Sequence, residues 1–376
     1  MDNKIKQQSA TNANTRWRTS ASLILVAPAA AASEDYNLLM LKRSEATAVA
    51  QNQTVFPGGL LDVEGDESVA WLEYFEQFGV SQESLRSLIL ISEHRPGILA
   101  PQGNGCYDRF FKRSKIWARE ITLRLTALRE CFEEVGILIC RSRAQLNQLD
   151  AVALTAQFQP EQQHFDRESW QRRVHNKPSE FLELCRELQV VPDLWALHEW
   201  SAWASPAIVK KGHETVFFMV FLDSQPILLA EPTEVKECLW RTPVEFLRMY
   251  QHEELWLMPP QIYELLRLLA IPDYRKLLHF ATQRSILGTT LFLPVGYNCS
   301  DGMVFALPGD ELYVAEPHLA IEPINFPGSA DELRARSTCL HRYEFTGPTV
   351  CRVHLNIPAP NGHLLPQNLP NPLHKL

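Results

Sequence analysis

The stretch RECFEEVGI, residues 129–137, combines one arginine and three glutamates with apolar residues. At the 100° rotation per residue of an α-helix, the four charged residues share one face, whereas the apolar residues of this stretch and of the preceding turns share the opposite face. Gly136 then stands where a helix commonly ends. We therefore predict a helix that ends at Gly136, with one face in the core and one face covered by charge.

The charged face consists of Arg129, Glu130, Glu133 and Glu134. In the simplest interpretation it is solvated surface, as most charge runs are. Three like charges on neighbouring turns nevertheless repel one another unless a positive group neutralises them. Mg²⁺ prefers oxygen ligands and is commonly held by one or two carboxylates together with substrate phosphates. The three glutamates are therefore candidate ligands of a divalent cation.

The composition limits the class of protein. The chain has 376 residues, of which 45% are hydrophobic and 21% charged, as in a folded globular protein. Its net charge of -8 makes nucleic acid an unlikely main partner, because binders of polyanions usually carry a basic excess. The eight cysteines form no CxxC pair and no zinc-type cluster, which indicates reduced core residues.

The charged helix resembles the second half of the Nudix box, Arg-Glu-U-x-Glu-Glu-x-Gly-U with U apolar. It matches at every defined position, through Arg129, Glu130, Cys131, Glu133, Glu134, Gly136 and Ile137. The box glycine should lie 14 residues before the arginine, but the candidate glycine turn, residues 56–59, puts Gly59 70 residues before it. The box is therefore interrupted by an insertion, which packed elements tolerate at modest cost in loop entropy. The box glutamate is displaced too, with Glu120 and Asp66 as its two possible substitutes.

This resemblance implies an α/β (α+β) Nudix fold, a mixed β-sheet sandwiched between helices, with a helical insertion inside the box and a C-terminal extension. It implies Mg²⁺ or Mn²⁺ as cofactor, and Arg129 as the residue that orients the glutamates. The implied metal site consists of Gly59, through its carbonyl, with Glu130, Glu133 and Glu134. A further carboxylate from a later loop is expected at Glu234, ahead of Glu231 and Glu237, although a solvated loop acid is an open alternative.

The residues before the glycine turn, LMLKRSEATAVAQNQTVFPGG, resemble the signature of coenzyme A diphosphatases, LLTxRSxxxRxxxGxxxFPGG. Leu41, Ala48 and Asn52 depart from it, which leaves the identity of the substrate in doubt. Lys42 and Arg43 could equally be surface cations at a strand end. The substrate-binding residues implied by the signature are Lys42, Arg43, Ser44, Phe56, Gly58 and Gly59.

The split box, the blocks ETVFFMVFL, ELWLMPPQIYELLRLL and DGMVFALPGDELYV, and the final tripeptide together resemble the peroxisomal coenzyme A diphosphatases of the Nudix family. That family implies hydrolysis of coenzyme A and acyl-coenzyme A to adenosine 3',5'-bisphosphate and 4'-phosphopantetheine or its acyl derivative. Two alternatives stay open. One is a Nudix hydrolase of NADH, FAD or an RNA cap, and the other is a non-catalytic coenzyme A-binding module that has lost the box glutamate.

The two ends of the chain carry possible address signals. The tripeptide His374, Lys375 and Leu376 differs from the peroxisomal signal SKL only at its first residue, which predicts a peroxisomal location and an import receptor as partner. The apolar run of residues 21–32 imitates a short signal peptide, but Pro28 interrupts it and a strand is the better interpretation. This run is too short to span a membrane, and we expect no membrane span.

We divide the chain into a disordered tail (1–17), a Nudix domain (18–265) and a C-terminal extension (266–376). The insertion occupies residues 66–118 and is predicted to contain helices near 71–79 and 83–94; it could be a lid over an acyl arm, a structural appendage or a dimer surface. The stretch up to about residue 180 is polar without a predicted element. Beyond a helix near 260–270, only strands are predicted.

Overall fold

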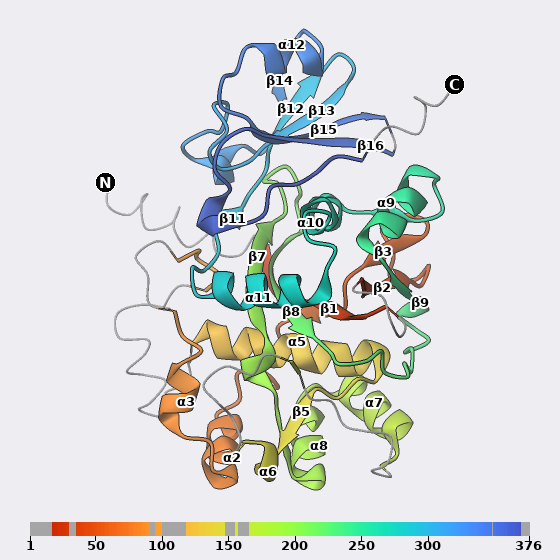
Figure 1. Ribbon diagram of the computed structural model, residues 1–376, viewed down its shortest axis with the longest axis vertical. Helices are drawn as coiled ribbons and strands as arrows, with labels where there is room; N and C mark the ends of the chain where they lie inside the picture. The colour runs from red at the N-terminus through yellow and green to blue at the C-terminus, as the bar shows by residue number, and fades with distance from the viewer. Residues whose placement is uncertain are drawn as a thin grey trace.

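The structure is a computed structural model, and it describes residues 17–29, 35–90, 95–99, 118–146, 155–156, 165–347 and 349–369. Residues 1–16 of the predicted tail, part of the insertion and the C-terminal tripeptide lie outside the described residues. Figure 1 shows a small sheet above a large one, with helices between them and beneath the large sheet.

The large sheet is mixed and has nine strands. Its central path runs β10-β3-β2-β1-β8-β7-β11, while β4 also pairs with β1 and β9 with β2. β1 lies parallel to β8 and antiparallel to β2. The strands are β1 (Trp17–Pro28), β2 (Tyr36–Arg43), β3 (Gln53–Val55), β4 (Gly58–Leu60), β7 (His198–Ala204), β8 (Gly212–Phe221), β9 (Val235–Arg241), β10 (Trp256–Leu257) and β11 (Leu291–Phe292).

β1 is apolar without alternation because both faces of the sheet are covered. Leu23 and Leu25 belong to the core cluster on one face, and Ile24 and Val26 to the cluster on the other. The strand predicted at the apolar run is therefore confirmed.

Helices cover both faces of the large sheet, as Figure 1 shows. α5 lies on one face with α2, α7 and α8 beyond it, and α9, α10 and α11 lie on the other. The predicted mixed sheet between helices is confirmed. The helices are α2 (Ala70–Phe78), α3 (Gln82–Arg86), α5 (Arg119–Val135), α6 (Arg143–Leu146), α7 (Arg167–Asn176), α8 (Glu180–Leu188), α9 (Pro243–Gln251), α10 (Pro259–Leu268), α11 (Tyr274–Ser285) and α12 (Ala330–Ala335).

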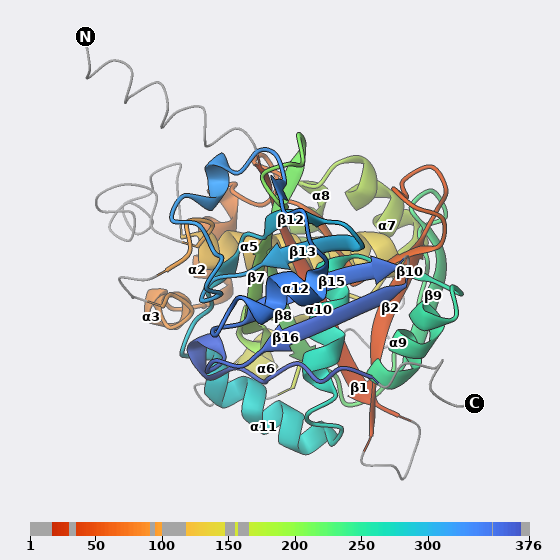
Figure 2. The same ribbon diagram turned by 90° about the horizontal axis from the view of Figure 1, so that it is seen from above.

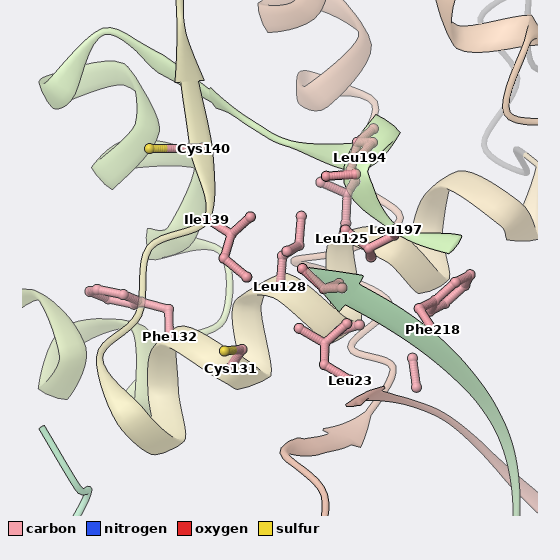
Figure 3. Packing of buried hydrophobic residues seen from close by; sticks show 14 of the residues in the cluster. Leu23, Leu125, Leu128, Cys131, Phe132, Ile139, Cys140, Leu194, Leu197 and Phe218 are labelled. Carbon is pink, nitrogen blue, oxygen red and sulfur yellow. The ribbon is translucent and has the colours of Figure 1, made fainter. Parts of the chain in front are cut away.

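The predicted charged helix is α5, and its apolar stripe packs on the sheet. Figure 3 shows Leu125 and Leu128 among Leu23 of β1 and Phe218 of β8. The helix ends at Gly136, which has a φ of 68° and donates its N–H to the Phe132 carbonyl. The prediction of a helix stopping at this glycine is confirmed. The opposite face is not solvated, however, since Glu133 and Glu134 are also buried.

A five-stranded sheet forms the C-terminal part, in the order β14-β12-β13-β15-β16. Strands were predicted in this part, and the sheet contains the antiparallel pairs β12/β13 and β15/β16. Seen from above, this sheet lies over α10 (Figure 2). The strands are β12 (Val295–Cys299), β13 (Gly302–Ala306), β14 (Ile324–Asn325), β15 (His341–Gly347) and β16 (Val350–Leu355); β5 (Cys140–Ser142) and β6 (Val190–Pro192) form a separate pair.

Four helices were missed, namely α6, α7, α11 and α12, and one was predicted too long. α7 lies in the stretch read as polar, and Asp166 caps it by accepting a hydrogen bond from the Ser169 N–H. α11 follows α10 where only strands were predicted, because its buried face is narrow. The helix predicted to reach residue 94 ends in the structure at Arg86, and residues 91–94 lie outside the described part. Periodicity is weak wherever few apolar residues mark a face.

The described part of the insertion belongs to the core. Trp71 of α2 packs against Phe181 of α8, with ring centroids 5.9 Å apart. The Tyr74 hydroxyl donates to the carbonyl of Cys185 at 2.7 Å. α2 therefore extends the core on the α5 side, as a structural appendage does. Residues 91–94 and 100–117 of the insertion are outside the described ranges.

Candidate active site

The glycine turn and α5 meet, although 70 residues separate Gly59 from Arg129. β4 carries the turn and pairs antiparallel with β1, so that Gly59 faces Ala21. The Gly58 N–H donates to the Glu134 carboxylate at 2.8 Å. The sheet therefore brings together the two halves of the interrupted motif.

Gly59 has no room for a side chain. A Cβ at this position would lie 2.4 Å from one carboxylate oxygen of Glu130, closer than real Cβ contacts allow. The close approach of backbone and carboxylate therefore depends on glycine. The Gly59 backbone lies directly against the proposed ligand Glu130.

Arg129 is the hub of the site and is 2% exposed. Its Nη1 donates to Glu133 at 2.6 Å and to Glu130 at 2.9 Å. Its Nη2 donates to the Leu60 carbonyl at 2.9 Å, which ties the helix to the glycine turn. Since charge-assisted bonds fix geometry well, Arg129 orients both glutamates.

Of the two possible substitutes for the box glutamate, the structure places only Asp66 beside Arg129. Its carboxylate accepts hydrogen bonds from Arg129 Nε and Nη2, both at 2.8 Å, and from the Thr126 hydroxyl at 2.8 Å. Glu120 instead pairs with Arg95, at 3.2 Å. Asp66 therefore anchors the arginine from the start of the insertion.

The carboxylates of α5 carry more negative charge than their protein partners neutralise. Burial and the Glu130 charge raise the pKa of Glu133 to about 8, although Arg129 opposes the shift. Burial, with the charges of Glu130 and Glu234, raises the pKa of Glu134 well above its usual value. A bound cation would relieve this repulsion.

The donor set fits a hard cation by its chemistry. All three glutamates offer oxygen, the donor that Mg²⁺ and Mn²⁺ prefer. No group of three acidic, histidine or cysteine side chains is already arranged around a metal position within the described ranges. Each of the three carboxylates is held by Arg129 or by the Gly58 N–H. An ion held by these carboxylates would need waters and substrate oxygens to complete its shell.

The loop between β8 and β9 crosses the end of α5, through the Glu231 N–H to the Glu134 carbonyl at 2.9 Å. Glu231 and Glu234 of this loop and Glu237 of the following strand β9 differ in their contacts. Glu231 accepts hydrogen bonds from the backbone N–H groups of Thr233 and Glu234 within its own turn. Glu237 pairs with Lys42 at 3.1 Å. The charge of Glu234 instead raises the pKa values of Glu130 and Glu134, so Glu234 lies near enough to act on the α5 carboxylates.

The predicted substrate-binding residues of β2 have different surroundings. Lys42 is engaged by Glu237, and the Ser44 hydroxyl donates to the Thr233 carbonyl at 2.6 Å, which holds the loop that carries Glu234. Arg43 forms no ion pair with any described residue, and its charge acts on Glu134. Arg43 is therefore the cation of this group that is left for an anionic substrate.

Phe56 requires a correction. It is 2% exposed and packs edge-to-face with Phe217, with ring centroids 6.3 Å apart, in the core cluster on the sheet face opposite α5. Phe56 therefore supports the glycine turn from the core side of the sheet. Its side chain does not line the site, contrary to the prediction that it binds substrate.

Sequence reasoning missed the contribution of α7. Gln171 donates to the carbonyls of Glu133 and Leu229, at 2.8 and 2.7 Å, and so joins α5 to the β8–β9 loop. The ring of His175 lies 3.9 Å from the Glu133 carboxylate. These residues are four apart and share one helix face, a signal that becomes visible once Asp166 is recognised as an N-cap.

His213 lies at the start of β8. Its ring lies 2.8 Å from the Arg18 guanidinium on the neighbouring strand β1. Burial and the charges of Arg18 and Arg43 lower its pKa. The charges of Arg18 and Arg43 therefore both reach His213, at the start of the central strand β8.

In this site an arginine orients a set of glutamates that pack on a glycine turn of a mixed sheet. This arrangement defines the class of Nudix hydrolases. Comparison with known families agrees: the NUDT19 Nudix domain model matches residues 17–268, and the NUDT19 C-terminal domain model matches residues 296–356. The chain belongs to the NUDT19 family of Nudix hydrolases.

Curated relatives cover most of the chain. A protein of Xenopus laevis named acyl-coenzyme A diphosphatase NUDT19 is 32% identical over 77% of this chain and 74% of its own. The protein of the same name from Homo sapiens is 29% identical over 94% of this chain and 96% of its own. Among solved structures, a NUDIX hydrolase from Alicyclobacillus acidocaldarius is 19% identical, with a TM-score of 0.48 over 70% of this chain and 96% of its own.

The family makes this chain an enzyme, and Nudix hydrolases generally use divalent metal ions. None of the helices in the described residues has the length and apolar character that crossing a membrane requires.

Proposed function

We propose that this Nudix hydrolase cleaves the diphosphate of coenzyme A and acyl-coenzyme A in a metal-dependent reaction. The products would be adenosine 3',5'-bisphosphate and 4'-phosphopantetheine or its acyl derivative. The observation that carries the proposal is the contact of the Gly58–Gly59 turn with Glu130 and Glu134, around the Arg129 hub. The names of the relatives support the choice of substrate.

In this proposal Glu130, Glu133 and Glu134, with the Gly59 carbonyl, hold Mg²⁺ or Mn²⁺. The ion, when bound, neutralises the charge of the diphosphate and lowers the pKa of a water molecule. Arg129 fixes the orientation of the carboxylates, and Glu234 adds a further carboxylate from the loop between β8 and β9. Arg43 binds negative charge of the substrate.

The departures from the coenzyme A signature differ in their consequences. Asn52 takes the place of a glycine and has a φ of 55°, a left-handed conformation that asparagine adopts more readily than most residues. Asn52 can therefore adopt a backbone conformation of the kind that the glycine of the signature permits. Ala48 stands where the signature has an arginine, so one cation of the signature is absent. NADH, FAD and an RNA cap therefore stay open as alternative substrates.

The proposal is tested by mass spectrometry of the products formed from coenzyme A, an acyl-coenzyme A, NADH, FAD and capped RNA. Each reaction is run with Mg²⁺, with Mn²⁺ and with EDTA. We expect metal-dependent release of adenosine 3',5'-bisphosphate, fastest from the coenzyme A compounds. Faster cleavage of another substrate would contradict the substrate assignment, and metal-dependent binding without any turnover would favour the non-catalytic module.

Substitution of a proposed metal ligand gives a second test. Glu133→Gln should lower kcat about 100-fold or more, because the ion contributes several kcal/mol to transition-state stabilisation. Glu168→Gln is the matched control, since that side chain is 73% exposed on α7. Full activity of the Glu133 variant would exclude Glu133 as a ligand.

We also propose a peroxisomal location, supported by the final residues His374, Lys375 and Leu376. A fluorescent protein fused in front of the full chain should co-localise with peroxisomes, and deletion of the tripeptide should abolish this. A fusion that stays diffuse with the tripeptide intact would refute the proposal.

A further inference from the structure

A small cavity lies on the face of the large sheet opposite α5, where the C-terminal chain meets the Nudix domain. It is lined by β7, by Arg267 of α10, by Arg284 of α11 and by the loop that carries His363. The cavity volume is about 10 Å³, which leaves room for one small ligand, either a water molecule or a monatomic ion.

The unpartnered polar atoms around this cavity are donors. Arg267 Nε, Arg284 Nε and Ser201 Oγ are buried without a hydrogen-bond partner among the described residues. His363 Nδ1 accepts from the Leu364 N–H at 2.7 Å, so Nε2 carries the hydrogen of the neutral ring. That Nε2 forms no hydrogen bond of normal geometry, and only the Trp200 carbonyl is near it as an acceptor.

The cavity borders an excess of positive charge. Arg267 is balanced by Glu264, at 3.1 Å. Arg284 is 2% exposed and donates only to the backbone carbonyls of Gly288 and Glu199. The carboxylate of Glu199 is engaged by Arg95, at 2.6 Å. Within the described ranges, this buried network of linked groups has one more arginine than glutamate: Arg95, Arg124, Arg267 and Arg284 against Glu120, Glu199 and Glu264.

A water molecule satisfies such a site poorly. A water molecule accepts two hydrogen bonds and needs acceptors for its own two hydrogens. A monatomic anion accepts hydrogen bonds from any direction and also neutralises positive charge. No carboxylate lines the cavity to play that role. An unpaired buried charge costs several kcal/mol, so a ligand that pairs it is strongly favoured.

We propose that this cavity is a binding site for one small monovalent anion of the size of chloride, held by Arg267, Arg284, Ser201 and His363. The ligand joins β7, α10 and α11 to the loop at residues 360–363. It thereby fixes the C-terminal chain on the Nudix domain. The site is separate from Glu130, Glu133 and Glu134 and needs no substrate.

The proposal is tested on the full-length protein by thermal unfolding in sodium chloride and in sodium gluconate at the same ionic strength. Raising chloride from 5 to 200 mM should raise Tm by about 2 °C more than gluconate does, as expected for a ligand of millimolar affinity. Crystals grown with bromide should show an anomalous peak between Arg267 Nε and Arg284 Nε. Equal Tm values in the two salts, with a water molecule in place of that peak, would overturn the proposal.

Variants distinguish the effect of chloride bound at this site from the general effect of salt on Tm. Ser201→Ala removes one donor with little change of volume and should weaken the chloride dependence several-fold. Arg284→Gln should abolish it. Arg173→Gln is the control, because Arg173 is a partly exposed arginine on α7, and it should keep the full dependence. An unchanged chloride dependence in Ser201→Ala and Arg284→Gln would place the bound ion elsewhere.

Discussion

Gly59 is the residue at which the absence of a side chain matters most for the proposed site. In Gly59→Ala the new methyl group would collide with the Glu130 carboxylate, which must move away from the turn. We expect activity to fall about 100-fold, since misplacement by about 1 Å costs that much, with a much smaller effect on folding. Steady-state kinetics and urea unfolding measure the two effects.

Gly97→Ala is the matched control, because a Cβ there meets nothing within 4 Å. It should leave both activity and stability near those of the parent protein. If Gly59→Ala were equally silent, the close contact between turn and carboxylate would not matter for catalysis.

Asp66 offers a second test at the scale of single residues. It is 2% exposed and holds Arg129 through two hydrogen bonds. Asp66→Asn should cost about 3 kcal/mol of unfolding free energy and also lower kcat, because it breaks a buried ion pair and releases the arginine that orients the glutamates. Asp66→Glu should recover part of both losses.

Glu120→Gln provides the contrast, because Glu120 is equally buried but pairs with Arg95 instead of Arg129. It should lower the unfolding free energy and leave kcat nearly unchanged. A loss of kcat in Glu120→Gln as large as in Asp66→Asn would contradict the assignment of Asp66 as the substitute for the box glutamate.

At the scale of elements, the loop between β8 and β9 combines a structural acid with a proposed functional one. Glu231→Gln weakens the turn that Glu231 caps and should lower Tm by a few degrees. Glu234→Gln should keep Tm and lower kcat about 10-fold or more, because it removes a charge that acts on the α5 carboxylates.

Glu237→Gln is the control, since Glu237 of β9 forms an ion pair with Lys42 of β2. It should change neither Tm nor kcat much. If Glu237→Gln and Glu234→Gln reduced kcat equally, the effect would come from the overall charge of the loop.

At the scale of the whole molecule, His341 reports how the small sheet docks on the Nudix domain. It is fully buried, and its ring lies 2.7 Å from the Tyr263 hydroxyl of α10 and 2.7 Å from the Pro308 carbonyl. Burial, with the charge of Arg267, lowers its pKa from 6.5 to about 4, although Asp310 opposes the shift.

The sign of the pH effect follows from proton binding. Between pH 6.5 and 4 the unfolded chain binds a proton at His341 that the folded chain does not, so stability falls as the pH falls. The full effect is about 3 kcal/mol. In His341→Gln this part of the pH dependence should vanish, as urea unfolding at several pH values would show. Exposed His279→Gln should keep it, and an identical slope in both variants would exclude His341 as the origin.

The sequence by itself determined the elements and residue types whose signals are local. The charged helix, its stop at Gly136, the glycine turn and most strands follow from periodicity and from residue preferences over a few positions. The grouping of Glu130, Glu133 and Glu134 was likewise predictable, because their spacing on a helix puts three carboxylates together.

Only the tertiary structure decided which distant residues meet. It places Asp66 and not Glu120 beside Arg129, buries Phe56 in the core and brings Gln171 to the end of α5. It also formed the cavity between Arg267 and Arg284. None of these contacts has a local signal, because each depends on how the sheet and the helices pack across long separations in the chain.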